Sequence, residues 1–295
     1  MKCKFFEKKS RNNLNPLLRF NFDSKKMRKI LIAPLVLLIS CQGGNTPESD
    51  PDIVTPHVET PEAVTIPYKI LNQISHDTSA YTQGLEIYNG KIYEGTGDFE
   101  QSSLRINNRK TGTVEFRHLL GKSDIFGEGI TILDNKLYQL TWENHKVFVY
   151  DLKNLNSPEK TMDWPHEGWG LTNDGKSLII SDGSSTLYSV NPADMKVIST
   201  VSVRDHQGPV SMLNELEMVD GFLYANVYQS NQIIKIDPSS GQVIGRMSFN
   251  GLLSSQEIIP DRTDVLNGIA YDSTSKTFLI TGKRWPKMFE IKLEK

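Results

Sequence analysis

The sequence predicts an all-β fold in which five similar four-stranded units close into a ring, a five-bladed β-propeller. Three observations predict it. One pattern recurs five times, each copy places a hairpin turn at the same position, and the copies start at residues 83, 128, 169, 214 and 267, which are 41 to 53 residues apart. Repeats of this length with four strands each are typical of propeller blades.

Each copy combines a short apolar strand, a tight turn and a second strand rich in aromatic residues. In chain order the copies read QGLEIYNGKIYEGTG, EGITILDNKLYQLTW, WGLTNDGKSLIISDG, NELEMVDGFLYANVY and NGIAYDSTSKTFLITGK. A third strand is expected at residues 104–107, 146–151, 186–191, 232–237 and 288–293. All copies except the last continue into a further turn and a fourth strand.

The turn between the first two strands of a copy has the composition of a tight β-hairpin. Four copies carry a pair of residues that tolerate positive φ there: Asn89-Gly90, Asp134-Asn135, Asp174-Gly175 and Asp220-Gly221. Two-residue hairpin loops need such residues because their backbone is left-handed. The repeats are therefore predicted to be hairpins of adjacent, antiparallel strands.

The two ends of the repeat region are predicted to complete each other. The fifth copy ends at Lys295 without a fourth strand, whereas YKILNQI at residues 68–74 is a strand candidate without a partner. We expect this N-terminal strand to join the last blade, because closure removes the exposed edges of an open sheet. A sandwich of alternating strands is the alternative fold.

Residues 1–41 are interpreted as an export signal. The apolar run ILIAPLVLLI at residues 30–39 is too short to span a bilayer and suits the central region of a signal peptide. A basic segment begins at Met27, which we interpret as the translation start. LISC at residues 38–41 resembles the bacterial lipobox, so Cys41 is the expected lipidation site. An unlipidated secretory signal is the alternative.

Residues 42–66 are predicted to be a disordered tether. The stretch through Pro67 contains five prolines, five acidic residues and no lysine or arginine, a composition that stays extended and solvated. We therefore expect an exported bacterial lipoprotein that is anchored to a membrane and faces the periplasm or the cell surface. The propeller domain is expected to occupy residues 67–295.

Composition excludes several classes of function. A net charge of −2 gives no basic surplus for nucleic acid, and both cysteines, Cys3 and Cys41, precede the propeller. The six histidines show no zinc-ligand spacing, and no GxSxG or phosphate-binding motif occurs. We therefore expect no cofactor, no metal and no nucleic-acid partner, and we expect a monomer.

Two sets of equivalent positions in the repeats differ in chemistry. The first strand of each propeller blade lines the central channel, so residues at equivalent positions converge at one mouth of it. The residues that open these strands are Gln83, Glu128, Trp169, Asn214 and Asn267. The residues that lie six positions into the second strand of each hairpin are Gly97, Trp142, Gly183, Tyr228 and Lys283. Together they indicate a pocket for a small ligand with a polar group and an apolar stem.

The protonation of this pocket is left open by the sequence. Burial among aromatic side chains raises the pKa of Glu128, while a neighbouring Lys283 lowers it, and the net direction does not follow from the residues alone. The structural alternative is that the amides cap strand ends and the aromatic rings fill the channel.

Seven segments, in order along residues 68–293, resemble the plant and bacterial type of glutaminyl-peptide cyclotransferase. They are YTQGL, FGEGIT, LTW, GWGLTNDG, LNELE, LNGIAY and TGKRWPKMFEI. The resemblance implies a five-bladed propeller that converts N-terminal glutaminyl residues of peptides or proteins to pyroglutamyl residues and releases ammonia. It implies no catalytic zinc, in contrast to the unrelated animal-type enzyme.

Carried over position by position, the resemblance implies a role for most residues of the predicted pocket. Glu128 corresponds to the general acid and base, and Lys283 to a polar group near the reacting amide. Gln83 and Asn214 correspond to substrate-binding amides, and Trp142 and Trp169 to pocket walls. The ring positions add Asn267 and Tyr228 to the expected substrate-binding residues. Tyr228 departs from the family pattern, which often has Trp there, so pocket shape and substrate preference are open.

Two other functions fit a propeller. A lactonase or esterase would bind a divalent cation through oxygen donors such as Glu128, Asn214 and Asn267, although Trp169 and Lys283 are poor neighbours for a cation. A non-catalytic binding propeller would tolerate the aromatic rings but has no use for a lone carboxyl beside an ammonium.

The connection between the fourth and fifth copies, residues 249–265, is the longest between any two copies. Long connections in compact domains are usually functional. It is expected to form either a partial lid over the pocket or a short amphipathic helix packed outside the propeller.

Overall fold

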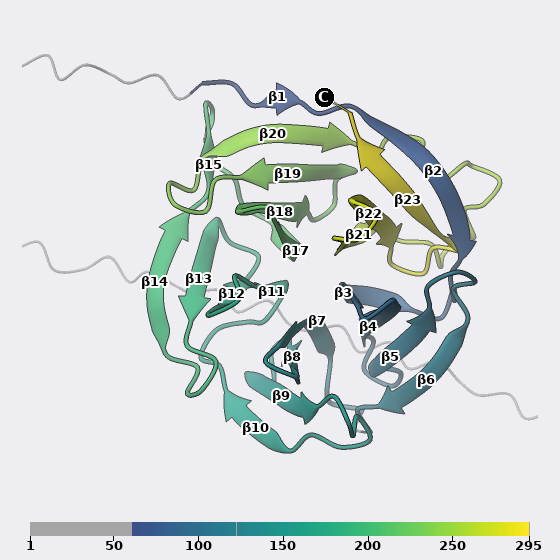
Figure 1. The fold of residues 1–295 in the computed structure, drawn as a ribbon, viewed down its shortest axis with the longest axis vertical. Coiled ribbons are helices and arrows are strands. Elements are labelled where there is room, and N and C mark those ends of the chain that lie inside the picture. The colour runs from purple at the N-terminus through teal and green to yellow at the C-terminus, as the bar shows by residue number, and fades with distance from the viewer. Residues whose placement is uncertain (1–60, 122, 295) are drawn as a thin grey trace, which may run out of the picture. The chain divides into compact units, whose positions relative to one another are not determined.

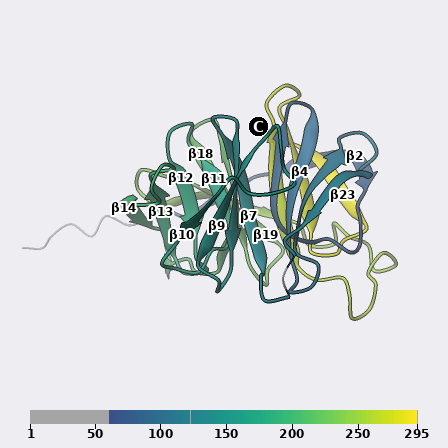
Figure 2. The same ribbon diagram turned by 90° about the horizontal axis from the view of Figure 1, so that it is seen from below.

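The computed structural model describes residues 61–121 and 123–294, and it confirms the all-β, five-bladed propeller. Five sheets surround a central axis, each with its first strand innermost (Figure 1). Figure 2 turns the ring on its side, and the loops that join the strands lie on its two faces. The expected signal at residues 1–41 and most of the expected tether lie outside the described residues.

The blades follow the predicted repeats. Blade 1 contains β3 (Tyr81–Tyr88), β4 (Lys91–Gly97), β5 (Ser103–Asn108) and β6 (Val114–Leu119), and blade 2 contains β7 (Gly127–Leu133), β8 (Lys136–Thr141), β9 (Lys146–Asp151) and β10 (Lys160–Asp163). Blade 3 contains β11 (Leu171–Asn173), β12 (Leu178–Ser181), β13 (Thr186–Val190) and β14 (Val197–Ser202). Blade 4 contains β17 (Leu213–Val219), β18 (Phe222–Val227), β19 (Gln232–Ile236) and β20 (Val243–Ser248).

Blade 5 closes the ring as predicted. It contains β21 (Leu266–Asp272), β22 (Thr277–Gly282) and β23 (Lys287–Leu293), and its outer strand is β2 (Tyr68–Ser75) from the start of the domain. β2 pairs antiparallel with β23, from Tyr68 opposite Leu293 to Ser75 opposite Lys287, and Figure 1 shows the two strands side by side.

Three of the four predicted two-residue turns have the predicted backbone, whereas the fourth is a four-residue loop, because Asn173 pairs with Leu178. Both residues of Asn89-Gly90, Asp134-Asn135 and Asp220-Gly221 have positive φ, and in the fourth pair Gly175 does. The pairing within each blade is antiparallel between neighbouring strands. A short two-stranded element that the sequence did not indicate, β15 (Arg204–Asp205) with β16 (Gly208–Pro209), joins blades 3 and 4.

The expected boundary between tether and propeller at residue 66 is wrong by a few residues. β1 (Val64–Thr65) pairs in parallel with β20, and the Ile66 amide donates to the Arg246 carbonyl at 2.8 Å. The Ile66 side chain covers Gly245, where a Cβ would lie 2.4 Å from it. The open edge of β20 explains this pairing, because an outermost strand leaves backbone groups unpaired.

The core is divided among the blade interfaces. Five clusters of buried apolar side chains lie between neighbouring blades, one for each pair in the ring. The cluster between blades 5 and 1 includes Ile74 of the closing strand with Leu85 and Leu279. Each blade therefore depends on both neighbours, and the ring is stabilised as a unit.

Candidate active site

The inner strands carry a β-bulge where four of the predicted site residues lie. The register shifts at residues 82–84 of β3, 127–130 of β7, 213–216 of β17 and 266–269 of β21. Gln83, Glu128, Asn214 and Asn267 occupy these shifts. A bulge bends a strand locally and redirects one side chain, so the four residues leave the regular in-and-out alternation.

A glycine next to several of these residues lets the inner strands approach closely. A Cβ on Gly129 would lie 2.6 Å from the Leu171 amide nitrogen, and one on Gly170 would lie 1.9 Å from the Asn214 carbonyl oxygen. Such positions exclude any larger residue because the obstacle is backbone. The narrow ring brings side chains from all five blades to one mouth.

A cavity of about 280 Å³ lies at this mouth. It contains seven of the eight side chains predicted for the site. The residues that line it are Tyr81, Gln83, Phe126, Glu128, Trp142, Trp169, Asn214, Tyr228 and Lys283. Cys41, the expected lipidation site, lies outside the described residues.

Asn267 is the predicted site residue that does not line the cavity. It is fully buried, and its side-chain amide donates to the Thr82 carbonyl at 3.0 Å and to Gln83 Oε1 at 3.3 Å. Asn267 therefore supports Gln83 through a hydrogen bond, and its contact with substrate stays a prediction. The repeat register predicted the position of Asn267 in the ring, but it could not show whether the side chain reaches the cavity.

Glu128 is a buried carboxyl with one direct side-chain partner among the described residues. It is 5% exposed, and its Oε1 accepts a hydrogen bond from Gln83 Nε2 at 3.2 Å. Burial raises the pKa of Glu128 well above its usual range, against the effect of Lys283 and with a further increase from Glu167. The net direction that the sequence left open is therefore upward.

Lys283 is a buried ammonium held mainly by aromatic rings. Its side chain is 3% exposed, and Nζ lies 4.8 Å from the ring centroids of both Tyr81 and Tyr228. Burial lowers its pKa, while Glu128 and Asp264 act in the opposite direction. Within the described part of the chain it forms no salt bridge. Cation–π attraction thus stabilises a charge that stays available to a ligand.

The two tryptophan walls share one acceptor. The indole nitrogens of Trp142 and Trp169 both donate to Glu167 Oε2, at 2.8 and 2.9 Å. Trp169 meets Tyr228 edge-on at 5.5 Å between ring centroids. The Glu167 carboxylate therefore fixes the orientation of two walls without lining the cavity itself.

Sequence reasoning missed two residues that line the cavity, Tyr81 and Phe126. They precede Gln83 and Glu128 by two positions, and their rings lie 6.1 Å apart, edge to face. Both hold the same place in the repeat, two positions before the residue that opens the first strand, so extending the repeat register by two positions was a signal that could have found them.

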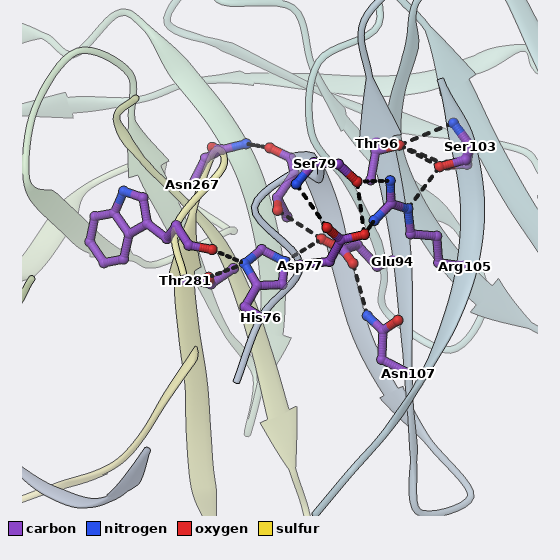
Figure 3. Close-up of polar contacts among 12 residues, drawn as sticks. His76, Asp77, Ser79, Glu94, Thr96, Ser103, Arg105, Asn107, Asn267 and Thr281 are labelled. Atoms are coloured by element: carbon purple, nitrogen blue, oxygen red, sulfur yellow. Dashed lines mark hydrogen bonds and ion pairs between the residues drawn. The ribbon is translucent and has the colours of Figure 1, made fainter. Parts of the chain in front are cut away.

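A buried polar network supports the pocket from behind, at the interface of blades 5 and 1 (Figure 3). His76 lies 2.8 Å from the Trp285 carbonyl through Nδ1 and 2.9 Å from Glu94 Oε1 through Nε2. Glu94 also accepts from Thr82 and Asn107. Both ring nitrogens of His76 therefore have a buried oxygen within hydrogen-bond distance, and its Nε2 pairs with a carboxylate.

The charge of this network is stabilised internally. Burial raises the pKa of Glu94, but the charge and hydrogen bond of His76 outweigh it, with help from Arg105, and bring the pKa to about 2. Thr82 precedes Gln83, and its carbonyl accepts from Asn267. The network thus joins the closure of the ring to the backbone that carries Gln83.

The donor set of the cavity does not suit a divalent cation. Glu128 is the sole carboxylate among the lining residues, and an ammonium lies near it. Across residues 61–121 and 123–294, no group of three or more His, Cys, Asp or Glu side chains is placed to hold a metal ion. Nor does this part of the chain contain a helix long and apolar enough to cross a membrane.

The connection of residues 249–265 is neither of the two structures expected for it. It consists of turns rather than a helix, and Leu252 and Leu253 pack against the core between blades 4 and 5. None of its residues lines the cavity. Asp264, near its end, nevertheless accepts a hydrogen bond from the Tyr81 hydroxyl at 2.8 Å.

Comparisons with known proteins agree on one family. The family model described as glutamine cyclotransferase matches residues 39–293. A glutaminyl-peptide cyclotransferase of Arabidopsis thaliana is 41% identical over 234 residues, which cover 77% of this chain and 71% of the plant protein. The crystal structure of Myxococcus xanthus glutaminyl cyclase superposes with a TM-score of 0.72 at 33% identity, covering 79% of this chain and 99% of that one.

Proposed function

This chain belongs to the glutamine cyclotransferase family, and on that premise we propose that it cyclises N-terminal glutaminyl residues of peptides to pyroglutamyl residues and releases ammonia. The observation that carries the proposal is the environment of the Glu128 carboxyl. A buried carboxyl with a raised pKa, close to an ammonium and open to a cavity, is suited to moving a proton at neutral pH.

The cavity offers recognition for an amide. Asn214 is 2% exposed and lines the cavity, and its buried Oδ1 has no hydrogen-bond partner among the residues that the structure describes. Buried polar atoms are normally paired, so this oxygen is suited to an N–H group of the substrate. A volume of about 280 Å³ is at the lower end for ligand pockets and suits one amino-acid residue.

The aromatic walls suit the geometry of the reaction. Cyclisation requires the substrate side chain to coil until the α-amine faces its own amide carbon. Flat walls such as Trp142 and Trp169, held in place by Glu167, restrict the side chain to compact conformations. Nucleophile and electrophile belong to one residue, so holding this conformation supplies much of the rate enhancement.

Glu128 would act twice in one turnover. The neutral α-amine attacks the side-chain amide carbon, the ring C–N bond forms, and the Glu128 carboxylate takes the proton that the nitrogen loses. The carboxylic acid then gives this proton to the amide nitrogen as its bond to carbon breaks, and ammonia leaves. Glu128 returns to its starting state, and such transfer contributes roughly a hundred- to ten-thousand-fold.

Lys283 is the residue best placed to stabilise the developing oxyanion. Its ammonium is buried, lines the cavity and has no salt bridge within the described residues, whereas the Gln83 amide already donates to Glu128. A fixed cation in a site shielded from water stabilises negative charge at little reorganisation cost.

A peptide series tests the proposed function. Peptides beginning with Gln, with Asn and with N-acetylated Gln are incubated with the protein, and mass spectrometry follows the loss of one ammonia. Loss from the Gln peptide alone is expected, and it should persist in the presence of a chelator. No loss from any peptide contradicts the proposal, and loss that the chelator abolishes favours a cation-dependent mechanism.

We further propose that residues 1–41 direct export and that Cys41 carries the lipid anchor of a monomeric, membrane-bound enzyme. The lipobox-like LISC segment supports the anchor. Metabolic labelling with a fatty acid in a bacterial host should label the parent but not Cys41→Ser. An unlabelled parent that fractionates without the membrane contradicts the anchor.

A further inference from the structure

Asp264 contacts the active site from outside the cavity. Its Oδ2 accepts the Tyr81 hydroxyl at 2.8 Å, although the two residues are 183 positions apart. Its own position is fixed by three hydrogen bonds: its amide donates to the Lys283 carbonyl at 3.0 Å, its carbonyl accepts from Trp285 Nε1 at 2.8 Å, and its Oδ1 accepts from the Val265 amide at 2.8 Å. The carboxylate is therefore a fixed anchor for the phenol.

The Tyr81 ring lies between this anchor and the cationic side of the pocket. Its centroid is 4.8 Å from Lys283 Nζ and 5.2 Å from Arg284 Cζ. Burial raises the pKa of Tyr81, and the hydrogen bond to Asp264 raises it further, so the hydroxyl remains a donor. The hydrogen bond at the hydroxyl thus fixes the orientation of the Tyr81 ring, and the face of the ring contacts the Lys283 ammonium.

We propose that Asp264 is a positioning residue for the cyclisation. Through the Tyr81 hydroxyl it fixes the ring that, together with Tyr228, holds the Lys283 ammonium toward the reacting amide. This inference rests on the proposed function, because it assigns Lys283 its part in that reaction. It also gives the connection of residues 249–265 a role in the site, although none of its residues lines the cavity.

The surroundings of Lys283 predict how the contact affects its charge. The groups that face it are Glu128 from β7, Asp264 from the connection, Tyr81 from β3 and Tyr228 after β18, and Arg284 follows it in the chain. Glu128 and Asp264 favour the charged form, and burial opposes it. Neutralising Asp264 removes one of two favourable charges, so Lys283 should lose its proton at a lower pH.

A double-mutant cycle tests the positioning role. Tyr81→Phe removes the hydroxyl and keeps the ring, and Asp264→Ala removes the acceptor. Each variant should lower kcat/KM by about five- to tenfold, mainly through kcat, and the double variant should be no worse than the poorer single variant. Asp261→Asn, an exposed carboxylate three residues earlier in the same connection, is the matched control and should match the parent.

A second measurement does not depend on turnover. NMR titration of labelled lysine side chains should show a lower pKa for Lys283 in Asp264→Asn than in the parent, and the alkaline limb of the rate profile should move the same way. The positioning role is overturned if both single variants keep the parent's kcat/KM, or if their losses of kcat/KM add in the double variant. It is also overturned if Asp264→Asn lowers the melting temperature while the titration of Lys283 is unchanged. A parent that does not cyclise Gln peptides overturns the proposed function instead.

Discussion

At the scale of single residues, the ionisation of the active-site carboxyl depends on the charge of the substrate's α-amino group. Burial disfavours the ionised form of Glu128, and it disfavours the charged form of Lys283 as well. An N-terminal α-amino group has an ordinary pKa of about 7.7–8.0, so it arrives partly as an ammonium. Placed near Glu128, this cation would lower the pKa of the carboxyl and bring the two groups close to exchanging a proton.

Glu128→Gln should change the pH dependence of stability. The pKa of Glu128 is higher in the folded chain than in the unfolded chain, where it is about 4.3, so the parent loses stability as the pH rises from that value toward the raised one. The variant lacks this loss and should melt at an equal or higher temperature at pH 8. Loss of the charge partner of Lys283 offsets part of the gain.

The measurement is the melting temperature at pH 4 and pH 8, with Glu143→Gln as the control for an exposed carboxyl. A Glu128→Gln variant that is clearly less stable than the parent at pH 8, and no less stable at pH 4, would show that the buried carboxyl stabilises the fold.

The sequence largely predicted which residues surround the cavity, but not which of their side chains reach it. The repeat register gave the ring position of each side chain because equivalent positions converge on one channel mouth. It could not show that the Asn267 amide is taken up by Thr82 and Gln83. The contact of Glu167 with the two tryptophans could not be predicted either, since it depends on the conformation of a loop.

At the scale of elements, the bulges and glycines of the inner strands decide where the site residues point. Bulges at the starts of β3, β7, β17 and β21 coincide with Gln83, Glu128, Asn214 and Asn267, of which the first three line the cavity. The hairpin turns were predictable from local chemistry, as the left-handed Asn89-Gly90 shows. β1 was not, because its pairing depends on the open edge of β20, which only the assembled blade presents.

Gly129→Ala should reduce both stability and activity. The added Cβ would lie 2.6 Å from the Leu171 amide nitrogen and 2.7 Å from the Trp169 carbonyl oxygen, and backbone cannot yield without moving Glu128. We expect a loss of about 2–3 kcal/mol in the free energy of unfolding. Urea unfolding measures it, with Gly90→Asn in an open left-handed turn as the control. Parent-like stability and turnover in Gly129→Ala would refute the close-approach argument.

Truncation from the N-terminus should separate the roles of β1 and β2. Removing residues 1–60 should leave the melting temperature unchanged, because the sequence predicts that they are export signal and tether. Removing residues 1–66 takes β1 and Ile66 from blade 4 and should lower stability by about 1–2 kcal/mol.

Removing residues 1–75 also takes β2 from blade 5 and should abolish cooperative folding, since β23 and part of the core between blades 5 and 1 become exposed. Calorimetry of the three truncations measures the series. Equal melting temperatures for the shortest and longest deletions would mean that the ring does not depend on this closure.

At the scale of the whole molecule, closure of the ring and support of the site use the same residues. His76 follows the closing strand β2 and pairs with Glu94 of β4, and Glu94 in turn holds Thr82 beside Gln83. The sequence predicted that the ends meet, because one strand lacked a partner. It did not predict the His76–Glu94 pair, because a single His and a single Glu do not recur in the repeats.

Glu94→Gln should remove an acid-sensitive part of the stability. The folded pKa of Glu94 lies well below its unfolded value, so the carboxylate contributes stability above about pH 4.3 that is lost as the pH falls toward the folded pKa. The variant breaks the buried His76–Glu94 pair, which should lower stability at pH 7 by about 3–5 kcal/mol.

Urea unfolding at several pH values measures this effect. The difference between the parent and Glu94→Gln should shrink as the pH falls from 5 toward 2. A constant difference across that range would mean that the pair contributes through shape alone.

Turnover by Glu128→Gln tests most directly whether the Glu128 pocket cyclises N-terminal glutaminyl residues. Pyroglutamyl product and ammonia are measured together for the parent and the variant, at a temperature where both are folded. The parent should form the two products in equal amounts, and the variant should be slower by at least about a hundredfold. Near-parental turnover by Glu128→Gln, or an inactive parent, would contradict the claim.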